Sequence, residues 1–309
     1  MHVLDRLNED TIRRHLAADE FFSLDLHAPA PEELKRLGEL LGLHPLAIED
    51  SLEFGQRPKL DEYGDKILLV FYAISGGRPV EVHIHLSGAW IVTVRRERCE
   101  PLAAGHRRLE AGVPRTEEEA VYKVLDAMAD SFFPLIERLD DEADHLEDAM
   151  LEKPSPSERD RLFALRREVG PLRRLVAQQR DTMVTGGELI ERLPGFEHDL
   201  AHDYFRDVYD HLIRIAADLD ALRDRLTGAT ELLLSNQSNR LNEVMKRLTI
   251  IATIFLPLTF VTGFFGQNFG WLVNHIDSVG DFVVLGVGGM VVPCVALFAW
   301  FRRAGFLDR

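Results

Sequence analysis

Two charge-free runs near the C-terminal end constrain this chain more than any other feature of its sequence. They cover residues 248–265 and 282–301, in a chain in which 28% of the residues are charged. A helix rises about 1.5 Å per residue and needs about 20 residues to cross a hydrocarbon core of about 30 Å. Both runs therefore predict transmembrane helices. The alternative interpretation is a buried helical hairpin in the core of a soluble protein.

Basic residues beside the two runs predict the orientation in the membrane. They are Arg240, Lys246 and Arg247 before the first run, and Arg302, Arg303 and Arg309 after the second. The connecting segment, residues 267–281, contains neither lysine nor arginine. Because basic residues favour the cytoplasmic side, we expect a multi-pass protein of the cell (inner) membrane with both termini in the cytoplasm. The first 20 residues are charged throughout, so no signal peptide is expected.

Composition and motifs disfavour several classes of function. Cys99 and Cys294 are too few for a thiolate metal cluster, and a structural disulfide between them is not expected. A net charge of −15 disfavours nucleic acid as a partner and suits a protein that handles cations. No phosphate-binding loop of the Walker type is present, so ATP-driven pumping is unsupported. The membrane potential would supply a divalent ion with about 4.6 kcal/mol per 100 mV. We expect neither an enzyme nor an organic cofactor.

The N-terminal part, residues 1–112, is expected to form a cytoplasmic α+β domain in which helices pack on a sheet. Apolar runs predict strands at residues 21–26, 67–74, 80–86 and 90–94. A helix is predicted from Pro31 to the residue before Gly42, because its leucines recur on one face and glycine commonly follows a helix end.

Residues 113–195 are expected to form a long helical hairpin, with helices at about 116–153 and 157–185. A third helix is predicted from Phe196, because apolar residues then recur three and four apart: Leu200, Tyr204, Val208, Leu212, Ile215, Leu219, Leu222, Leu226, Ala229 and Leu233. No proline follows before Pro257, so the stalk (196–247) and the first transmembrane segment (248–265) are predicted to be one helix. We expect it to pack against the hairpin and against copies of itself.

One face of this first transmembrane segment is small or polar. Its residues are Asn242, Met245, Thr249, Ala252, Leu256, Thr259 and Gly263. Two explanations stay open, because small residues let helices approach closely and hydroxyl or amide groups can also line a wet path. Two transmembrane helices per chain cannot enclose a channel. A pore would therefore need an oligomer with the first segment of each copy turned inward.

Two further groups of residues have a structural and a functional interpretation. An acidic run at residues 140–148 could collect cations, but a solvated helix face is favoured. His83 and His85 alternate on a predicted strand, so their rings lie on the same face. No third metal ligand is evident beside them, and an exposed strand face is favoured over a metal site.

Gly266-Gln267-Asn268 stands at the outer end of the first transmembrane segment, directly after the charge-free run at residues 248–265. This tripeptide is similar to the Gly-Met-Asn signature of the CorA family of magnesium transporters, and residues 242–260 look like the family's first transmembrane helix. The resemblance covers essentially the whole chain. Earlier matches lie at residues 44–50, 56–60 and 204–211. The resemblance implies a funnel-shaped homopentamer with an external loop (266–281), a second, outer transmembrane helix (282–301) and a cytoplasmic tail (302–309).

The resemblance also implies roles for single residues. Asn268 would form a ring of amide oxygens that holds hydrated Mg²⁺, and Gly266 would let backbone carbonyls face the axis. Thr259 and Asn242 would form further polar rings, and an apolar constriction would come from Met245, Leu248 and Leu256. Asp207 would bind a regulatory Mg²⁺ between subunits, with a partner carboxylate that the sequence does not identify.

Gln267 stands where the family signature has methionine, and we expect it to brace the loop. Zinc-transporting relatives also depart from the signature at this position. The leading hypothesis is a passive Mg²⁺ channel, with Co²⁺ and Ni²⁺ as further ions, closed by cytoplasmic Mg²⁺. The alternatives are a zinc transporter on the same scaffold, coupled to protons, and a membrane cation sensor that does not conduct.

Overall fold

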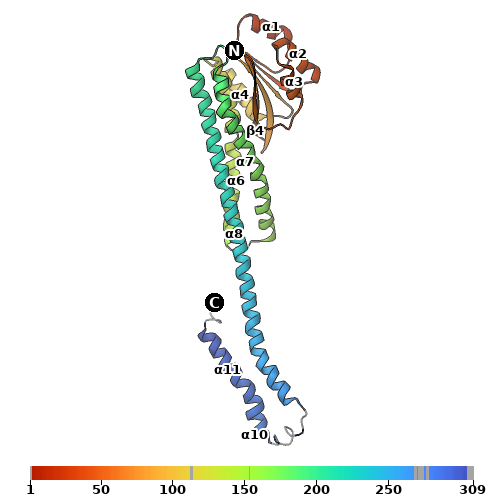
Figure 1. The fold of residues 1–309 in the computed structure, drawn as a ribbon, viewed down its shortest axis with the longest axis vertical. Coiled ribbons are helices and arrows are strands. Elements are labelled where there is room, and N and C mark those ends of the chain that lie inside the picture. Colours follow the sequence, from red (N-terminus) through yellow and green to blue (C-terminus); the bar gives the residue numbers. More distant parts are fainter. Residues whose placement is uncertain are drawn as a thin grey trace. The chain divides into compact units, whose positions relative to one another are not determined.

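The computed structural model describes residues 2–111, 114–152, 154–267, 270, 275 and 278–304. The chain divides into two compact units, residues 1–230 and 231–309 (Figure 1). The first contains a sheet and a layer of helices, and the second contains helices alone among its described residues.

The first unit is built on a six-stranded mixed sheet with the order β1-β2-β6-β5-β4-β3. The strands are β1 (His2–Leu4), β2 (Phe22–His27), β3 (Lys59–Tyr63), β4 (Lys66–Ser75), β5 (Arg78–Ser87) and β6 (Trp90–Arg95). The three strands at the β1 edge pair in parallel, and the others pair antiparallel. The four predicted strands are confirmed. β1 and β3 escaped prediction because one has three residues and the other is mostly polar.

Three helices cover one face of the sheet: α1 (Glu9–Ala17), α2 (Pro31–Leu41) and α3 (Pro45–Leu52). Pro31 occupies the first turn of α2, and Gly42 ends it in the left-handed conformation at φ 62°, so both predicted ends are confirmed. The apolar core beneath these helices joins Ile12 of α1 and Leu37 of α2 to Phe22 and Val92 of the sheet. This core fixes α1 and α2 on the sheet.

The remaining helices of the unit are α4 (Glu100–Ala111), α5 (Glu117–Asp130), α6 (Phe132–Leu151), α7 (Pro156–Glu191) and the first part of α8 (His198–Phe265). The helix expected at 116–153 is instead two helices. They meet at Ser131, whose hydroxyl donates to the Met128 carbonyl (2.5 Å) and accepts from the Ile74 amide of β4 (2.7 Å). This contact with the sheet holds the junction between α5 and α6.

α7 continues past the end expected at residue 185. Gly186 and Gly187 lie inside the helix, and a Cβ on Gly186 would come within 2.7 Å of the Leu60 side chain of β3. The glycine therefore permits close packing on the sheet instead of ending the helix. The Gln179 side chain, from the same helix, accepts from the Tyr72 amide (2.8 Å) and donates to its carbonyl (3.2 Å), just beyond the residues of β4 that pair with β3.

The apolar stripe of α8 is confirmed as a surface that packs within its own chain, whereas packing of α8 against copies of itself stays a prediction. From Val208 to Leu233 its members are at most 4% exposed within the single chain. Figure 1 shows α6, α7 and this part of α8 side by side. This part of the stripe is covered by helices of its own chain, so contacts with another copy would have to use other faces of α8.

The second unit contains the rest of α8 and a helical segment from Val279 to Arg303, made of α10 (Val279–Asp281), the π-helical η1 (Phe282–Val287) and α11 (Gly288–Arg303). Both predicted transmembrane segments lie in these helices, and α8 continues without a break from stalk to membrane segment, as predicted. Both helices are long and apolar enough to cross a membrane. Cys99 and Cys294 are free thiols, so no disulfide links them.

Candidate functional site

The predicted pore-lining residues of α8 are all exposed in the single chain. They are Asn242, Met245, Leu248, Thr249, Ala252, Leu256, Thr259 and Gly263. Leu256 is 75% exposed, and no residue of the most apolar stretch of α8 is buried. Among the described residues, no other helix of the single chain buries this face.

The half-buried residues of the same segment lie on the opposite face of the helix. They are Ile250, Thr253, Ile254, Pro257, Leu258 and Val261. At about 100° per residue, the mean directions of the two sets differ by roughly 150°. Gly289 of α11 faces Val261, with space for a Cβ 3.7 Å from its methyl group. The second transmembrane helix therefore meets α8 on the side away from the predicted pore face.

Two threonines give the exposed face of α8 its hydroxyl groups. Thr249 donates to the Met245 carbonyl and Thr259 to the Phe255 carbonyl, both at 2.8 Å. These bonds use the hydroxyl protons and turn the oxygen lone pairs outward as acceptors. Acceptor oxygens suit the water shell of a hydrated cation, whose hydrogens point outward.

The signature segment is described only in part. α8 ends at Phe265, after which the Gly266 amide donates to the Thr262 carbonyl (2.9 Å) and the Gln267 amide to the Phe264 carbonyl (3.3 Å). Gly266 and Gln267 are exposed, and Asn268 lies outside the described residues. The end of the helix therefore places the signature directly after the exposed face.

Asp207, the predicted regulatory ligand, lies in a cluster of titratable groups between α4, α5 and α8. Its carboxylate accepts a hydrogen bond from the Tyr122 hydroxyl (2.8 Å) and lies 3.9 Å from the His211 imidazole one turn along α8. His211 Nδ1 is 3.3 Å from a carboxylate oxygen of both Asp126 and Asp130 on α5. The structure thus adds four ionisable groups to the one residue that the sequence indicated.

The cluster carries more negative than positive charge. Three carboxylates converge there, and Arg108 of α4 contacts Asp126 at 3.1 Å. Burial, then the nearby Asp130 charge, raises the pKa of Asp126, while His211 and Arg108 oppose the shift. Burial, together with the hydrogen bond to Asp207, also raises the pKa of Tyr122, so its hydroxyl keeps its proton and donates. A divalent cation would offset the repulsion between these carboxylates.

The geometry of the cluster is suitable for a metal ion. Ligand atoms of Asp126, Asp130 and His211 lie within 4.8 Å of one another, all on partly buried side chains. His211 Nδ1 is buried and, although it lies near two carboxylates, makes no well-aligned hydrogen bond. An orphaned nitrogen between two carboxylates is consistent with a position that an ion can occupy. Carboxylate oxygens suit Mg²⁺, whereas the imidazole adds a ligand that Zn²⁺, Co²⁺ and Ni²⁺ accept.

The two strand histidines are not on an exposed face, which corrects the expectation. His83 and His85 are at most 1% exposed, because α3 and the segment after it cover this part of β5. His85 Nε2 bonds the Ser51 hydroxyl of α3 (2.8 Å), and His83 Nε2 bonds Glu81 (2.7 Å) while its ring stacks on Phe54. Burial lowers the pKa of His85 to about 3, so it is neutral at physiological pH. Both residues are structural.

The acidic run on α6 is paired as well as solvated. Arg225 of α8 contacts Asp140 at 2.5 Å and also Asp144, and Arg161 of α7 contacts Glu142. Both arginines neutralise part of the run; Arg225 links α6 to α8, and Arg161 links α6 to α7. The expected solvated helix face is therefore only part of its role.

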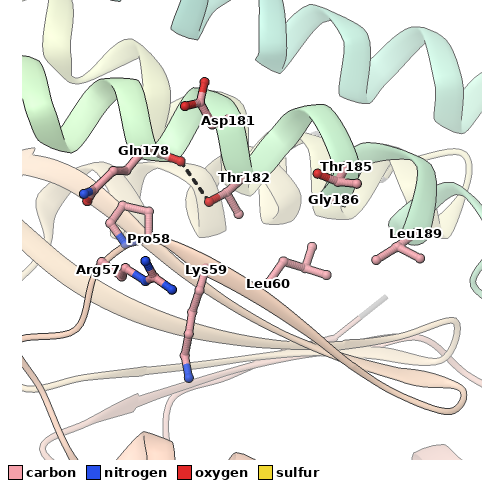
Figure 2. A pocket seen from close by; sticks show the side chains of 10 residues that line it. All are labelled: Arg57, Pro58, Lys59, Leu60, Gln178, Asp181, Thr182, Thr185, Gly186 and Leu189. Atoms are coloured by element: carbon pink, nitrogen blue, oxygen red, sulfur yellow. Dashed lines mark hydrogen bonds between the residues drawn. The ribbon is translucent and has the colours of Figure 1, made fainter.

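A pocket of about 400 Å³ lies between β3 and α7, where the 56–60 motif forms one wall (Figure 2). Asp181 is the single acid among its lining residues, and it pairs with Arg180 at 2.7 Å. Arg57 and Lys59 line the same pocket, and Lys59 is held by Asp50 (2.6 Å) and Asp61 (3.0 Å). This charge balance does not fit a divalent cation site.

Comparisons with known proteins bear on the whole chain. The family model described as CorA-like Mg²⁺ transporter protein matches residues 19–303. The cobalt/magnesium transport protein CorA of Thermotoga maritima is 32% identical over 284 residues, which cover 89% of this chain and 80% of that protein. The zinc transport protein ZntB of Yersinia enterocolitica is 29% identical over 260 residues, covering 81% and 77%.

Solved structures show the same fold. The complete structure of the CorA magnesium transporter from Methanocaldococcus jannaschii aligns with a TM-score of 0.78 at 22% identity, covering 92% of this chain and 90% of that one. The full-length CmaX protein aligns with a TM-score of 0.72 at 28% identity, covering 91% and 87%. The mixed sheet, the long helix and the two apolar helices are thus shared along nearly the whole chain.

Proposed function

The chain belongs to the CorA-like Mg²⁺ transporter family, and we propose that this membrane protein is a passive Mg²⁺ channel that cytoplasmic Mg²⁺ closes. Family membership makes it a divalent cation transporter with two transmembrane helices, and not an enzyme. The ion it carries, the residues that line its path and its oligomeric state are the proposal.

The exposed face of α8 is the observation that carries the proposal. Among the described residues, this face is exposed in the single chain, and α11 meets the opposite face. Two apolar helices that are almost unburied cannot enclose a channel by themselves. A ring of identical copies, a homopentamer as in the resemblance, would turn these faces toward one axis and leave the outer surfaces to lipid.

The outer mouth of the channel is assigned to Gly266, Gln267 and Asn268. Mg²⁺ gives up its water reluctantly, so neutral amide oxygens can hold the hydrated ion without trapping it. In the proposal, Asn268 supplies this ring, Gln267 braces the loop, and Thr259 and Asn242 supply polar rings further along α8. Met245, Leu248 and Leu256 form the apolar constriction, which stays dry when the channel is closed.

Purified protein in liposomes tests the pathway directly. Asn268→Ala is expected to abolish most Mg²⁺ uptake, whereas Asn274→Ala, a change to another asparagine of the same loop sequence, is expected to retain it. Equal uptake in the two variants would remove the central residue from the proposal. Binding of Mg²⁺ with no uptake by the unaltered protein would instead favour the cation sensor.

Regulation is assigned to the cluster around Asp207. With a cation bound, the carboxylates no longer repel one another, and the cytoplasmic units hold the closed ring. Asp207→Ala and Asp207→Lys are expected to relax inhibition by internal Mg²⁺. Asp203→Ala, one turn earlier on α8 and 3.5 Å from Arg206, is the matched control and is expected to leave inhibition unchanged. Normal inhibition in both Asp207 variants would reject this role.

A zinc transporter is the second candidate, because Gln267 replaces the methionine of the signature and ZntB matches 81% of this chain. Ion competition separates the candidates. Excess Zn²⁺ is expected to leave most Mg²⁺ uptake intact if the leading proposal holds. Zn²⁺ uptake that rises with a proton gradient while Mg²⁺ is excluded would establish the second candidate.

A further inference from the structure

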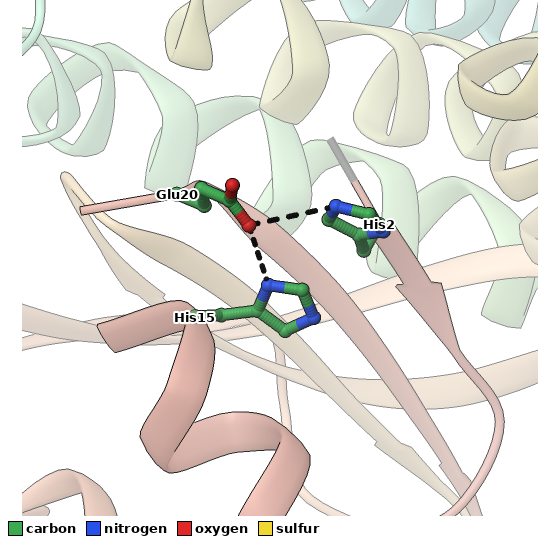
Figure 3. Close-up of side chains that lie close together, drawn as sticks. All are labelled: His2, His15 and Glu20. Carbon is green, nitrogen blue, oxygen red and sulfur yellow. Dashed lines mark hydrogen bonds and ion pairs between the residues drawn. The ribbon is translucent and has the colours of Figure 1, made fainter. Parts of the chain in front are cut away.

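A second group of potential metal ligands lies at the β1 edge of the sheet, far in sequence from the Asp207 cluster. His2, His15 and Glu20 approach one another there, with ligand atoms within 4.8 Å (Figure 3). His15 Nδ1 is 2.9 Å from Glu20 Oε2, and His2 Nε2 is 3.6 Å from the same oxygen. Both imidazoles therefore point a nitrogen at one carboxylate oxygen.

Three different backbone elements hold these side chains in place. His2 lies in β1, where it pairs with Phe22 in the parallel register. His15 lies in the last turn of α1, is 8% exposed, and its ring packs against the Phe22 ring with centroids 6.0 Å apart. Asp19 takes a left-handed conformation at φ 54°, after which the Glu20 amide donates to the His15 carbonyl (3.0 Å). The turn after α1 thus brings the carboxylate back to the imidazole.

We propose that His2, His15 and Glu20 form a binding site for a divalent transition metal of the Zn²⁺, Co²⁺ or Ni²⁺ class, separate from the transport pathway and from the Asp207 cluster. Two imidazole nitrogens and one carboxylate oxygen are the ligands that these ions accept, with a water in the fourth position. Mg²⁺ prefers an octahedron of oxygens, so the site discriminates against it.

The distances are close to those of a bound ion. Ligands at about 2.0–2.1 Å from a tetrahedral metal lie about 3.3–3.4 Å from one another. The two separations, 2.9 and 3.6 Å, lie on either side of this value. A metal would take the place of the hydrogen bond between His15 and Glu20.

One rearrangement is required. The His2 and His15 rings are stacked, with centroids 4.3 Å apart and planes at 27°, so both nitrogens cannot point along their ring planes at one ion. The His2 side chain is 53% exposed and can turn about its own bonds, while the more buried His15 stays fixed. Binding would therefore unstack His2 and link β1 to α1.

Zinc titration of the tag-free, full-length protein in detergent tests the site, with the number of tightly bound Zn²⁺ ions per chain as the measurement. His2→Ala and Glu20→Gln each change an exposed side chain and are expected to lower this number by one, with a loss of affinity at this site of at least about 100-fold, since even outer-shell partners are worth about 10–100-fold. His27→Ala, a change to another exposed histidine, is the matched control and is expected to change nothing.

Three outcomes would overturn the proposal. The number of bound ions could be the same in His2→Ala, Glu20→Gln and the unaltered protein, which would make the triad a structural ion pair and stack. The missing ion could be lost from His211→Ala instead, which would assign it to the Asp207 cluster. Excess Mg²⁺ could displace the ion bound at the triad, which would contradict the ligand chemistry.

A spectroscopic readout identifies the ligands. Co²⁺ bound to two imidazoles in a tetrahedral site has strong visible absorption, which is expected in the unaltered protein and in His211→Ala but not in His2→Ala. Because this readout does not involve transport, it separates the triad from the proposed channel. Loss of uptake in Asn268→Ala together with an unchanged Co²⁺ spectrum would support both assignments independently.

Discussion

The two halves of α8 differ in how their helical faces are covered. From Val208 to Leu233 the apolar stripe is at most 4% exposed, because helices of the same chain pack on it. From Asn242 to Gly263 the small and polar face is exposed throughout. The first half of this continuous helix is thus packed against its own chain. The face in the second half is not. In the proposed channel, lipid and other copies of the chain would cover the exposed half.

Truncation of a leucine in each half gives the largest expected contrast. Leu219 is fully buried, and Leu219→Ala is expected to lower the free energy of unfolding of the first unit by about 2–5 kcal/mol, because it leaves a cavity. Leu256 is 75% exposed in the chain, and Leu256→Ala is expected to leave that free energy unchanged. Native-state hydrogen exchange of the sheet amides measures both values. An equal loss in both variants would show that the halves are not packed differently.

Acidification is expected to affect the first unit through His85. Burial lowers the pKa of His85 to about 3 in the folded state, against about 6.5 in the unfolded chain. The folded state therefore binds fewer protons between these values, and stability that is present above pH 6.5 is lost as the pH falls. At about 1.4 kcal/mol per pH unit, lowering the pH from 7 to 4 costs the unit roughly 3 kcal/mol through this residue.

The variant His85→Gln isolates this contribution, because its amide can still bond the Ser51 hydroxyl and does not titrate. Its unfolding free energy is expected to fall less steeply between pH 7 and 4 than that of the unaltered protein. His27→Gln, at an exposed position of β2, is the control and should keep the original slope. Parallel curves for all three proteins would contradict the assignment.

Local sequence signals predicted much of the fold. Pro31 and Gly42 gave the ends of α2, alternation gave β5, and the charge-free runs gave both transmembrane helices. Each of these signals acts within a few residues, so it can be read without knowledge of the tertiary structure. Prediction was less complete where it depended on which other element packs against a helix or strand. Periodicity predicted that the stripe of α8 is covered by the hairpin, but it did not show that this cover is nearly complete from Val208 to Leu233.

The site residues show the same limit. The position of Asp207 followed from a local match. Tyr122, which bonds Asp207, and Asp126, which contacts His211, lie more than 80 positions earlier and reach this part of α8 only through the tertiary fold. Spacing offered a partial signal, because Asp126 and Asp130 are one turn apart on α5, as Asp207 and His211 are on α8. These two pairs, on separate helices, do not predict a metal site until the fold places them side by side. The prediction that His83 and His85 lie on an exposed strand face was wrong for a similar reason, because α3 covers them from another part of the chain.

The smallest expected effect concerns the cluster through which the first half of α8 would respond to cations. The pKa of Asp126 is raised by burial, so the stability it contributes is complete below about pH 3.9, its unfolded value, and is lost as the pH rises through its folded pKa. In EDTA at pH 7, Asp126→Asn is therefore expected to be at least as stable as the unaltered protein. At pH 4 this advantage should shrink.

With a divalent cation bound, the unaltered protein should become more stable than Asp126→Asn. Bound Mg²⁺ stabilises the ionised carboxylates, so the melting temperature of the unaltered protein is expected to rise with Mg²⁺ concentration more than that of Asp126→Asn. Asp148→Asn, at an exposed position of α6, is the control and should respond as the unaltered protein does. If Asp126→Asn responded fully to Mg²⁺, the cation would act elsewhere on the chain. The exposed half of α8 would then be the place to look, because the ion would be binding where the chain leaves its own packing incomplete.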